Sequence, residues 1–514
     1  MSWNPFKRSK PPQPESGKKS RRSPLFKLKS TQSRGLFSAS EYDHNNSGWD
    51  ATAVPVGQVI DRKLLSLVAR SREQVSNNDY ARGFVREVRK NVWGSKGIQL
   101  QVRGKDPSGS LDAVANEAIE RAYKKWCRRQ NCSVDGRLDY VRLGRVAINM
   151  AVGSGEAFIR IVEGDAAGPW GFSLQVIDSL RVPVGVNDTR LRNGNVIRHG
   201  IEMTPYGRPV SYLVETKAGV LADPFKHNGK EFERVPAEDM LHIYDMEQAE
   251  QFRGLPWTHS SLTRMKNVAG FEEASVVNAR AGASKTMVLK ADPDVYEADE
   301  DEEEPEFDLE PNSVVVLPPG YEPVDYSPDF PSAETASFIK SQLRGTASGW
   351  GVAYNSIAND LEGVNFSSIR QGKLDERDGW KDLQEWFIEA FCRPIYERWL
   401  EHSLLSGKIV LPTGNALNAS RYEKFLDVEW QPRRWEWVDP LKEEKAISEA
   451  QSNGRKSPSE AIRESGRDPD AVWQAYADDI AAMRAKGIPD NFIFRILGLS
   501  AIAPSDGEED GQEE

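Results

Sequence analysis

The side chains best suited to metal or redox chemistry are few in this sequence and lie far apart. It has three cysteines, Cys127, Cys132 and Cys392, and six histidines that occur singly: His44, His199, His227, His242, His259 and His402. Zinc needs about four ligands, and three cysteines cannot form an even disulfide framework. We therefore expect no metal site and no cofactor, with the cysteines serving as packing residues.

The motifs of several large enzyme classes are missing as well. The sequence has no Gly-x-x-x-x-Gly-Lys-Ser/Thr loop, no His-Glu-x-x-His and no Gly-x-Ser-x-Gly, which are signatures of P-loop ATPases, zinc proteases and α/β-hydrolases. Carboxylates are plentiful, so a two-metal nuclease stays open as an alternative. The densest acidic run, however, lies in a low-complexity segment rather than on ordered strands. The sequence predicts a protein that is not an enzyme.

Charge is concentrated in two segments, although the net charge is only −11. Residues 1–35 hold ten Lys or Arg and one acid, whereas residues 291–339 hold sixteen acids and no Lys or Arg. The acidic segment is densest at Asp299, Glu300, Asp301, Glu302, Glu303 and Glu304. Its simplest interpretation is a solvated loop, and a docking surface for a basic partner is the alternative. The basic arm is rich in Ser and Pro, and we expect it to be disordered when free.

The first half of the chain predicts an α+β body. Apolar residues at helical spacing predict a helix from Asp61 to Trp93 and two more at about 110–129 and 137–152. Period-two alternation and β-branched residues predict strands, which lie at 98–102, 157–162, 172–177, 196–203 and 210–214. The turn Pro205-Tyr206-Gly207-Arg208-Pro209 joins the last two strands.

The second half is mainly helical. A helix at about 256–284 is rich in Ala and Gly, which lets helices approach closely, and the acidic segment follows it between short strands at 287–289 and 314–317. Next we predict a helix at about 332–348, a loop from Tyr354 to Asn365 and a long helix from Ser367 to Leu405 that Pro394 kinks. Three capped helices begin at Asp439-Pro440, Ser457-Pro458 and Asp468-Pro469 and end at Gly454, Gly466 and Gly487.

Length and hydropathy limit the class of protein further. A chain of 514 residues predicts two or more packed regions. No stretch approaches the roughly 18 apolar residues of a membrane helix, and no apolar run follows the first basic residues. We expect no membrane segment and no secretory signal, and folding in a reducing cytoplasm.

Nine stretches, taken in their order along the chain, resemble the lambda-type phage portal family over about residues 60–490. They are Asn91-Val92-Trp93-Gly94-Ser95-Lys96-Gly97-Ile98, Gly155-Glu156-Ala157-Phe158, Leu174-Gln175-Val176-Ile177-Asp178, Gly200-Ile201-Glu202, Tyr206-Gly207-Arg208-Pro209 with Tyr212, Met240-Leu241-His242-Ile243-Tyr244, Gln251-Phe252-Arg253-Gly254-Leu255-Pro256-Trp257, Asn365-Phe366-Ser367-Ser368-Ile369-Arg370 and Trp437-Val438-Asp439-Pro440-Leu441-Lys442-Glu443. Taken singly, three of them are most simply a hairpin turn, a helix entry and a helix cap. The order of all nine carries the resemblance.

The resemblance implies a portal fold, with an α/β wing, a helical stem, a small clip, a kinked long helix and a helical crown. The implied parts are a basic arm at 1–60, the wing at 61–256, stem helices at 257–285 and 332–352 with the acidic clip at 286–331 between them, a tunnel loop at 353–365, the long helix and wing return at 366–438, the crown at 439–489 and an acidic tail at 490–514.

The resemblance implies that the chain forms a dodecameric ring at one capsid vertex. The implied function of this ring is that of a passive channel for genome packaging and ejection. The implied partners are other copies of the chain, double-stranded DNA, the terminase large subunit, the major capsid or scaffold protein, and neck or head-completion proteins. The particle would be a virion assembled in the host cytoplasm, with the clip acids docking terminase and neck proteins. A terminase-like nuclease and a minor capsid or scaffold protein without a channel are the alternatives.

The predicted tunnel loop has no cation. Its residues expected to face DNA are Asn355, Ser356, Asn359, Asp360, Glu362 and Asn365. Because phosphate contacts from clustered Lys and Arg strengthen binding steeply, a loop without cations would touch DNA without gripping it. Lys340 and Arg344, one helical turn apart in the second stem helix, either line the channel as basic rings or pair with acids. The sequence does not decide between these two arrangements.

Overall fold

The computed structural model describes residues 53–188, 191–216, 231–283, 288–291, 321–324, 334–360, 366–435, 440–465, 467–490 and 492–493. Most of the predicted basic arm, the acidic run at 299–304 and the loop residues Glu362 and Asn365 lie outside these ranges. All described elements from Pro55 onward belong to one compact unit. None of the helices in the described ranges is long and apolar enough to cross a membrane.

The segment predicted as one helix over 61–93 is two helices, α1 (Val56–Asn77) and α2 (Asp79–Val92). Between them Asn78 is extended, and its side-chain oxygen accepts hydrogen bonds from the backbone N–H groups of Tyr80 and Ala81. Asn commonly caps helices in this way because its side-chain oxygen accepts from the first backbone N–H groups of the helix, which have no partner within the helix. The prediction of a single helix is therefore wrong, and Asn78 starts a second one.

A three-stranded antiparallel sheet lies at the centre of the body and has the order β3-β2-β8. Its strands are β2 (Glu156–Glu163), β3 (Phe172–Ile177) and β8 (Met240–Tyr244). In the middle strand, Phe158 is opposite Ile177 on one side and His242 on the other. Helix α5 (Tyr140–Ser154) leads into β2 and packs on it.

A second antiparallel sheet has the order β4-β5-β6-β7, with β4 (Val196–Arg198), β5 (Ile201–Met203), β6 (Pro209–Glu215) and β7 (Phe232–Pro236). The strand predicted at 196–203 is thus two short strands. They are joined by a tight turn in which His199 and Gly200 have φ of 51° and 78°. A Cβ at Gly200 would lie 2.7 Å from the Pro183 carbonyl oxygen, so this turn needs glycine.

The remaining elements of the body close its core. They are α3 (Ala113–Trp126), α4 (Arg129–Cys132), the pair β1 (Gln99–Val102) and β11 (Val428–Gln431), and the 3-10 turns Asp165–Ala167, Ser179–Arg181, Ala237–Asp239, His259–Ser261 and Ala419–Leu426. Trp93 is fully buried and meets the ring edges of Phe387 and Phe391 at centroid distances of 5.3 and 5.5 Å. The buried Cys132 and Cys392 belong to the same core.

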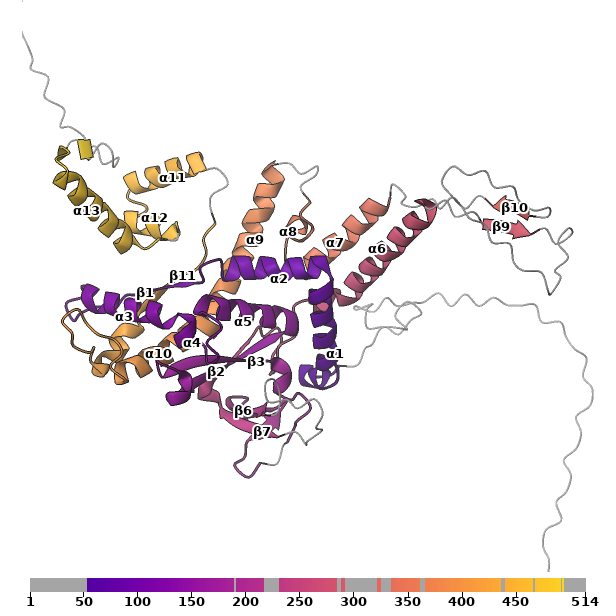
Figure 1. The fold of residues 1–514 in the computed structure, drawn as a ribbon, viewed down its shortest axis with the longest axis horizontal. Coiled ribbons are helices and arrows are strands. Elements are labelled where there is room, and N and C mark those ends of the chain that lie inside the picture. Colours follow the sequence, from indigo (N-terminus) through magenta and orange to yellow (C-terminus); the bar gives the residue numbers. More distant parts are fainter. Residues whose placement is uncertain are drawn as a thin grey trace, which may run out of the picture. The chain divides into compact units, whose positions relative to one another are not determined.

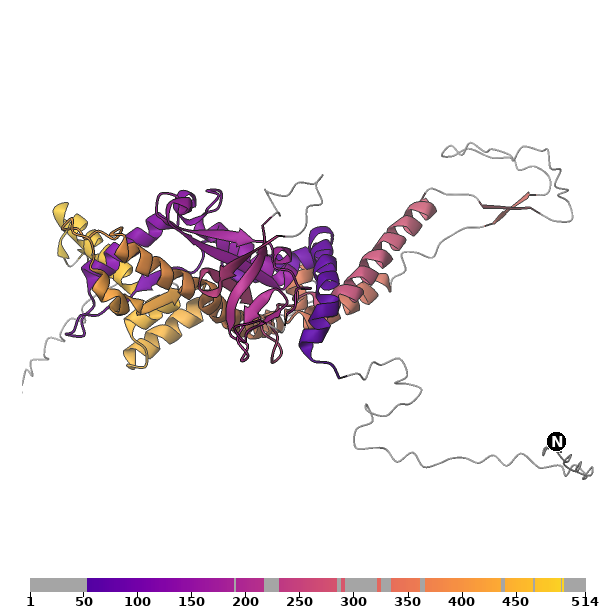
Figure 2. The ribbon, with the colours of Figure 1, turned by 90° about the horizontal axis from the view of Figure 1, so that it is seen from below.

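Helices α6 (Leu262–Ala283) and α7 (Thr335–Gly349) lie side by side, as Figures 1 and 2 both show. Phe271 and Phe338 meet between them at 5.1 Å. Two glycines of α7 make room for the start of α6, because a Cβ at Gly349 would lie 2.9 Å from the Ser261 hydroxyl and one at Gly345 would collide with Arg264. Beyond α6, β9 (Val288–Ala291) pairs with β10 (Tyr321–Val324), and the strand predicted at 314–317 lies outside the described residues.

The predicted long helix is present over Phe366–Leu405, but it is not one regular helix. It consists of α9 (Phe366–Phe387), a π-helical turn (Ile388–Cys392) and α10 (Arg393–Leu405). The sequence predicts a kink at Pro394 because proline removes one hydrogen bond, and the irregular turn directly precedes this proline. A proline ring clashes with the carbonyl four residues earlier, which a wider turn relieves.

Three short helices follow β11 within the described ranges, α11 (Pro440–Ser452), α12 (Pro458–Glu464) and α13 (Pro469–Ala485). Each begins at the predicted proline, and the side chains of Ser457 and Asp468 cap α12 and α13 as expected. The described part of the chain is thus a mixed helix and sheet structure, as its sequence predicts.

Candidate functional site

The site begins where the chain leaves α7, in the segment predicted as a tunnel loop. Residues 354–358 form a short helix, α8 (Tyr354–Ala358), so the expectation of a loop starting at Tyr354 is wrong there. Ile357 is only 7% exposed and anchors the helix to α2, while Asn359 ends it in the left-handed conformation with φ 51°. Asn tolerates this conformation better than most residues, which explains the abrupt end.

Two basic residues of α7 contact this segment rather than standing free. The Lys340 ammonium lies 2.7 Å from an Asp360 carboxylate oxygen and 5.6 Å from the centre of the Tyr354 ring, and the Arg344 guanidinium lies 5.7 Å from that centre. The Tyr354 hydroxyl donates to the same Asp360 oxygen at 3.0 Å. Burial, followed by the hydrogen bond and charge of Asp360, raises the pKa of Tyr354. We call Lys340, Arg344, Tyr354 and Asp360 the α7 latch.

Glu376 of α9 holds the other side of the segment. Its carboxylate accepts hydrogen bonds from the Ser356 hydroxyl at 2.9 Å and from the Ala353 backbone N–H at 3.3 Å. Burial and the nearby Glu87 carboxylate raise the pKa of Glu376, against the lowering effect of these two hydrogen bonds. Segment 353–360 is therefore held by α7 at Tyr354 and Asp360 and by α9 at Ala353 and Ser356.

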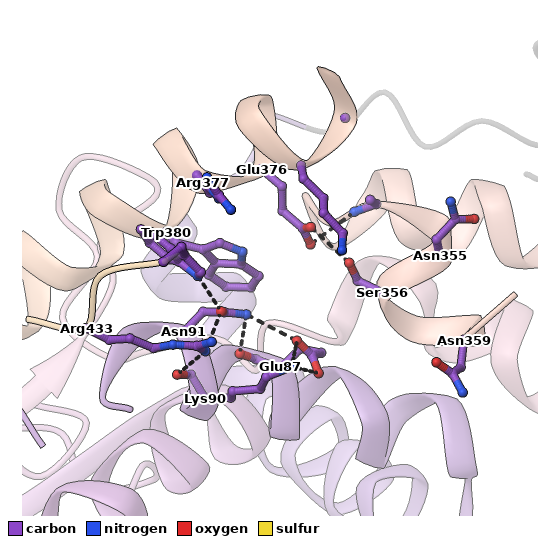
Figure 3. A pocket seen from close by; sticks show the side chains of 14 residues that line it. Glu87, Lys90, Asn91, Asn355, Ser356, Asn359, Glu376, Arg377, Trp380 and Arg433 are labelled. Carbon is purple, nitrogen blue, oxygen red and sulfur yellow. Dashed lines mark hydrogen bonds and ion pairs between the residues drawn. The ribbon is translucent and has the colours of Figure 1, made fainter. Parts of the chain in front are cut away.

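A cavity of about 350 Å³ lies between this segment and the body (Figure 3). Its walls come from α2, α8, α9 and the chain after β11, and the lining residues that Figure 3 labels are Glu87, Lys90, Asn91, Asn355, Ser356, Asn359, Glu376, Arg377, Trp380 and Arg433. Ser356 points at Glu376 in this view. The cavity has both acids and cations on its walls, so it has no clear preference for an ion of either sign.

Asn91 fixes the chain on the opposite wall of this cavity. Its side-chain oxygen accepts hydrogen bonds from the Arg433 guanidinium at 2.9 Å and the Trp435 indole N–H at 3.0 Å. Its backbone carbonyl accepts a bond from Gln384 of α9 at 2.7 Å. One side chain thus joins α2 to the segment that leads from β11 toward α11. Sequence reasoning noted Asn91 only as part of a motif.

A second cluster, missed as a cluster by sequence reasoning, lies inside the body. Glu156 at the start of β2 and Arg253 are each about 1% exposed, and the Arg253 Nε atom donates to both Glu156 oxygens at 2.9 Å. His242 of β8 lies 2.9 Å from Glu156. Burial would raise the pKa of Glu156, but the charge of Arg253 and the bonds from His242 and Arg253 hold it at about 2.

Two glycines allow the chains of this cluster to meet. A Cβ at Gly155 would lie 2.4 Å from the Leu255 carbonyl carbon, and a Cβ at Gly254 would lie 2.0 Å from the Gly155 oxygen. Arg253 also donates to the backbone carbonyls of Val182 and His199. The motifs Gly155-Glu156 and Arg253-Gly254 therefore form one buried junction that joins both sheets, which is a structural role.

The structure brings four of the six predicted loop residues together. Asn355, Ser356, Asn359 and Asp360 lie in one segment, and the side chains of Asn355 and Asn359 have no hydrogen-bond partner among the described residues. Glu362, Asn365 and the acids at 299–304 lie outside the described ranges. Within those ranges no three His, Cys, Asp or Glu residues are grouped as metal ligands would be.

Comparisons with known proteins identify the family. A family model described as "Phage portal protein, lambda family" matches residues 42–384. A protein of Halomonas phage phiHAP-1 named "Probable portal protein" is 32% identical over 486 residues, which cover 92% of this chain and 92% of that protein.

Solved structures are similar at lower identity. A chain from the neck of an empty GTA particle has 15% identity and a TM-score of 0.41, covering 79% of this chain and 94% of its own. A chain from the neck of a native GTA particle computed with C12 symmetry has 16% identity and a TM-score of 0.40, with the same coverage.

The family match and the phage relative confirm the resemblance drawn from the nine motifs. The chain belongs to the lambda family of phage portal proteins, and its function is that of a portal in a phage particle. Portal proteins are in general structural rather than enzymatic.

Proposed function

We propose that the chain assembles into a closed ring of twelve copies at one capsid vertex and that double-stranded DNA passes through this ring during packaging and ejection. Beyond the family membership, one observation carries the proposal: a face of α6 that the described residues of its own chain leave exposed. Gly270, Ala274 and Val277 lie at spacings of four and three on this face. Ala274 is exposed, Val277 is 58% exposed, and a Cβ at Gly270 would meet no atom within 4 Å.

Other faces of α6 are already occupied. Phe271 contacts Phe338 of α7, and Glu272 accepts a hydrogen bond from the Tyr80 hydroxyl. Exposed valine on a solvated helix costs free energy, roughly 25 cal/mol for each Å² of apolar surface. Small residues beside it let another helix approach closely, so a neighbouring copy is the occupant that fits the face.

Segment 353–360 supports the DNA-facing role. Its acid, Asp360, is neutralised by Lys340, and the Ser356 hydroxyl donates to Glu376. The side-chain amides of Asn355 and Asn359 are left without a hydrogen-bond partner in the part of the chain that the structure describes. Neutral amides form hydrogen bonds with phosphates but release no counterions, so they bind DNA weakly and with little salt dependence. In this proposal Lys340 and Arg344 support the loop from behind rather than forming free basic rings.

The remaining assignments of the portal fold follow the same proposal. Residues 61–256 form the wing, the α6–α7 pair the stem and α11–α13 the crown, and the clip with the acids at 299–304 docks the terminase large subunit and later the neck or head-completion proteins. The basic arm meets acidic surfaces of capsid or scaffold protein. Assembly takes place in the host cytoplasm.

Electron microscopy of the purified full chain tests the ring. We expect images of twelve copies around a central hole, and a protein that is strictly monomeric at all concentrations and salts would refute the ring.

The channel role is tested with Asn355→Lys and Asn359→Lys together, which would add about two dozen cations to a twelve-fold channel. We expect intact rings that bind duplex DNA more tightly at low salt and package it poorly. Ser108→Lys and Ser110→Lys, at exposed positions elsewhere, add the same charge as a control. Normal packaging by variant rings would show that the segment does not face DNA.

A further inference from the structure

A group of arginines covers one face of α2 without neutralisation. Arg82, Arg86 and Arg89 lie at spacings of four and three, so they share a face. Arg82 and Arg86 are exposed and Arg89 is half-buried, and none of them has a carboxylate partner within the part of the chain that the structure describes. Burial, together with the charges of Arg145 and Arg86, lowers the pKa of Arg89. We call Arg82, Arg86 and Arg89 the arginine face.

The arginine face borders a groove of about 440 Å³ between α1, α2 and α5. Its floor includes the apolar side chains of Val75 and Val85. Asn149 also lines the groove, and its side-chain oxygen is buried with no hydrogen-bond partner among the described atoms. Repelling cations and an unsatisfied amide beside apolar residues are features of a surface that another molecule covers.

A second uncompensated group has the opposite sign. Asp245 follows β8, where the Trp386 indole N–H of α9 donates to the Tyr244 carbonyl at 3.2 Å and brings Asp382, one helical turn earlier on α9, near Asp245. Partial burial, followed by the charges of Glu247 and Asp382, raises the pKa of Asp245. All three residues are exposed, and no Lys or Arg pairs with them among the described residues. Asp245 and Glu247 border a separate cavity of about 300 Å³. We call Asp245, Glu247 and Asp382 the acidic group.

Helix α2 separates the two groups. Phe84 and Val88 face the cavity that Asp245 and Glu247 border, whereas Arg82, Arg86 and Arg89 face the groove beside α5. At 3.6 residues per turn these directions differ by roughly 150° around the helix axis. A cationic side and an acidic side on one subunit fit head-to-tail association, which closes into a ring when the rotation between copies closes.

We propose that the arginine face of one subunit binds the acidic group of the neighbouring copy, so that each contact in the ring pairs the two groups once. This inference rests on the proposed ring and names the residues that orient its subunits. Guanidinium groups fit carboxylates well because they can donate two parallel hydrogen bonds. Charge complementarity of this kind chiefly fixes the register and direction of association.

Reversing the charges on each side tests the proposal in the full chain. One variant carries Arg82→Glu and Arg86→Glu, a second carries Glu247→Arg and Asp382→Arg, and a third carries all four changes. Mass photometry measures ring content at low and high salt. We expect each two-residue variant to lose rings at a concentration where the wild type is fully assembled, and the four-residue variant to regain them, because the reversed charges again match.

Arg121→Glu serves as the control, since Arg121 lies on α3 with its side chain 57% exposed. Rings of this variant are expected to persist.

If the wild type forms rings and both two-residue variants form them equally well, the pairing of the two groups is refuted but the ring is not. Failure of the four-residue variant to recover, with its circular dichroism unchanged, also counts against the pairing. Variants with normal rings but weaker binding of duplex DNA would assign the groove to nucleic acid and overturn the proposal. A wild type that never assembles refutes the ring itself.

Discussion

At the scale of single residues, the most constrained group is the buried pair of Glu156 and Arg253. Removing one partner of a buried ion pair costs about 3–5 kcal/mol, because the other charge stays buried without compensation. We therefore expect Glu156→Gln to lower the free energy of unfolding by about this amount, as measured by urea denaturation. Glu163→Gln is the control, because Glu163 pairs with Arg398 at an exposed position and is expected to cost less than about 1 kcal/mol. An equal effect of the two changes would contradict the assignment.

The pH dependence of the same pair has a definite sign. The pKa of Glu156 is about 2 in the folded chain against an ordinary value of 4.5. A carboxyl group whose pKa is depressed on folding stabilises the protein above its unfolded pKa and loses this contribution as pH falls toward the folded pKa. The stability advantage of the wild type over Glu156→Gln is thus expected to be constant above about pH 5 and to shrink between about pH 4.5 and 2. Denaturation of both proteins across this range measures it, and a constant difference would show that Glu156 does not titrate as described.

At the scale of elements, the α7 latch decides how firmly segment 353–360 is held. Its ion pair is about one-third exposed at Lys340 and one-quarter at Asp360, so it contributes at most about 1 kcal/mol. Asp360→Asn is therefore expected to leave global stability almost unchanged while amide hydrogen exchange at 354–358 becomes faster. Asp378→Asn breaks a more exposed pair with Lys381 on α9 and is expected to leave this exchange unchanged. Unchanged exchange in Asp360→Asn would mean that the ion pair with Lys340 does not hold the segment.

Elements were predictable from the sequence where their signals are local. The prolines and caps at Ser457 and Asp468 predicted the starts of α12 and α13, because a cap acts within one helical turn. The break at Asn78 and the short helix α8 were missed, since both depend on burial against the rest of the body as well as on residue type.

The contact of Glu156 with Arg253 joins residues 97 positions apart, and a single sequence carries no local signal for such a pairing. The six candidate loop residues were recognised by family resemblance, whereas the latch and Glu376, which hold the described segment 353–360, required the structure.

At the scale of the whole molecule, the fold of one subunit leaves part of its apolar surface for other copies. Val277 of α6 and Val114 of α3 are 58% and 54% exposed, so the same substitution removes a similar exposed surface at either position. Only Val277 lies on the small-residue face that we assign to the contact between subunits. A charge buried in such a contact without a partner costs several kcal/mol, and the cost is repeated at every interface of a ring.

We therefore expect Val277→Glu to abolish rings, or to shift their assembly to at least about tenfold higher protein concentration, which corresponds to about 1.4 kcal/mol. The melting temperature of the monomer is expected to stay within a few degrees of the wild type, because the residue is exposed in the isolated chain. Val114→Glu is the matched control and is expected to assemble normally. Analytical ultracentrifugation over a concentration series measures both variants. Full assembly of Val277→Glu would place the contact between subunits elsewhere than on α6. Equal loss of rings in both variants would show that acidic charge alone controls assembly, rather than burial of this face of α6.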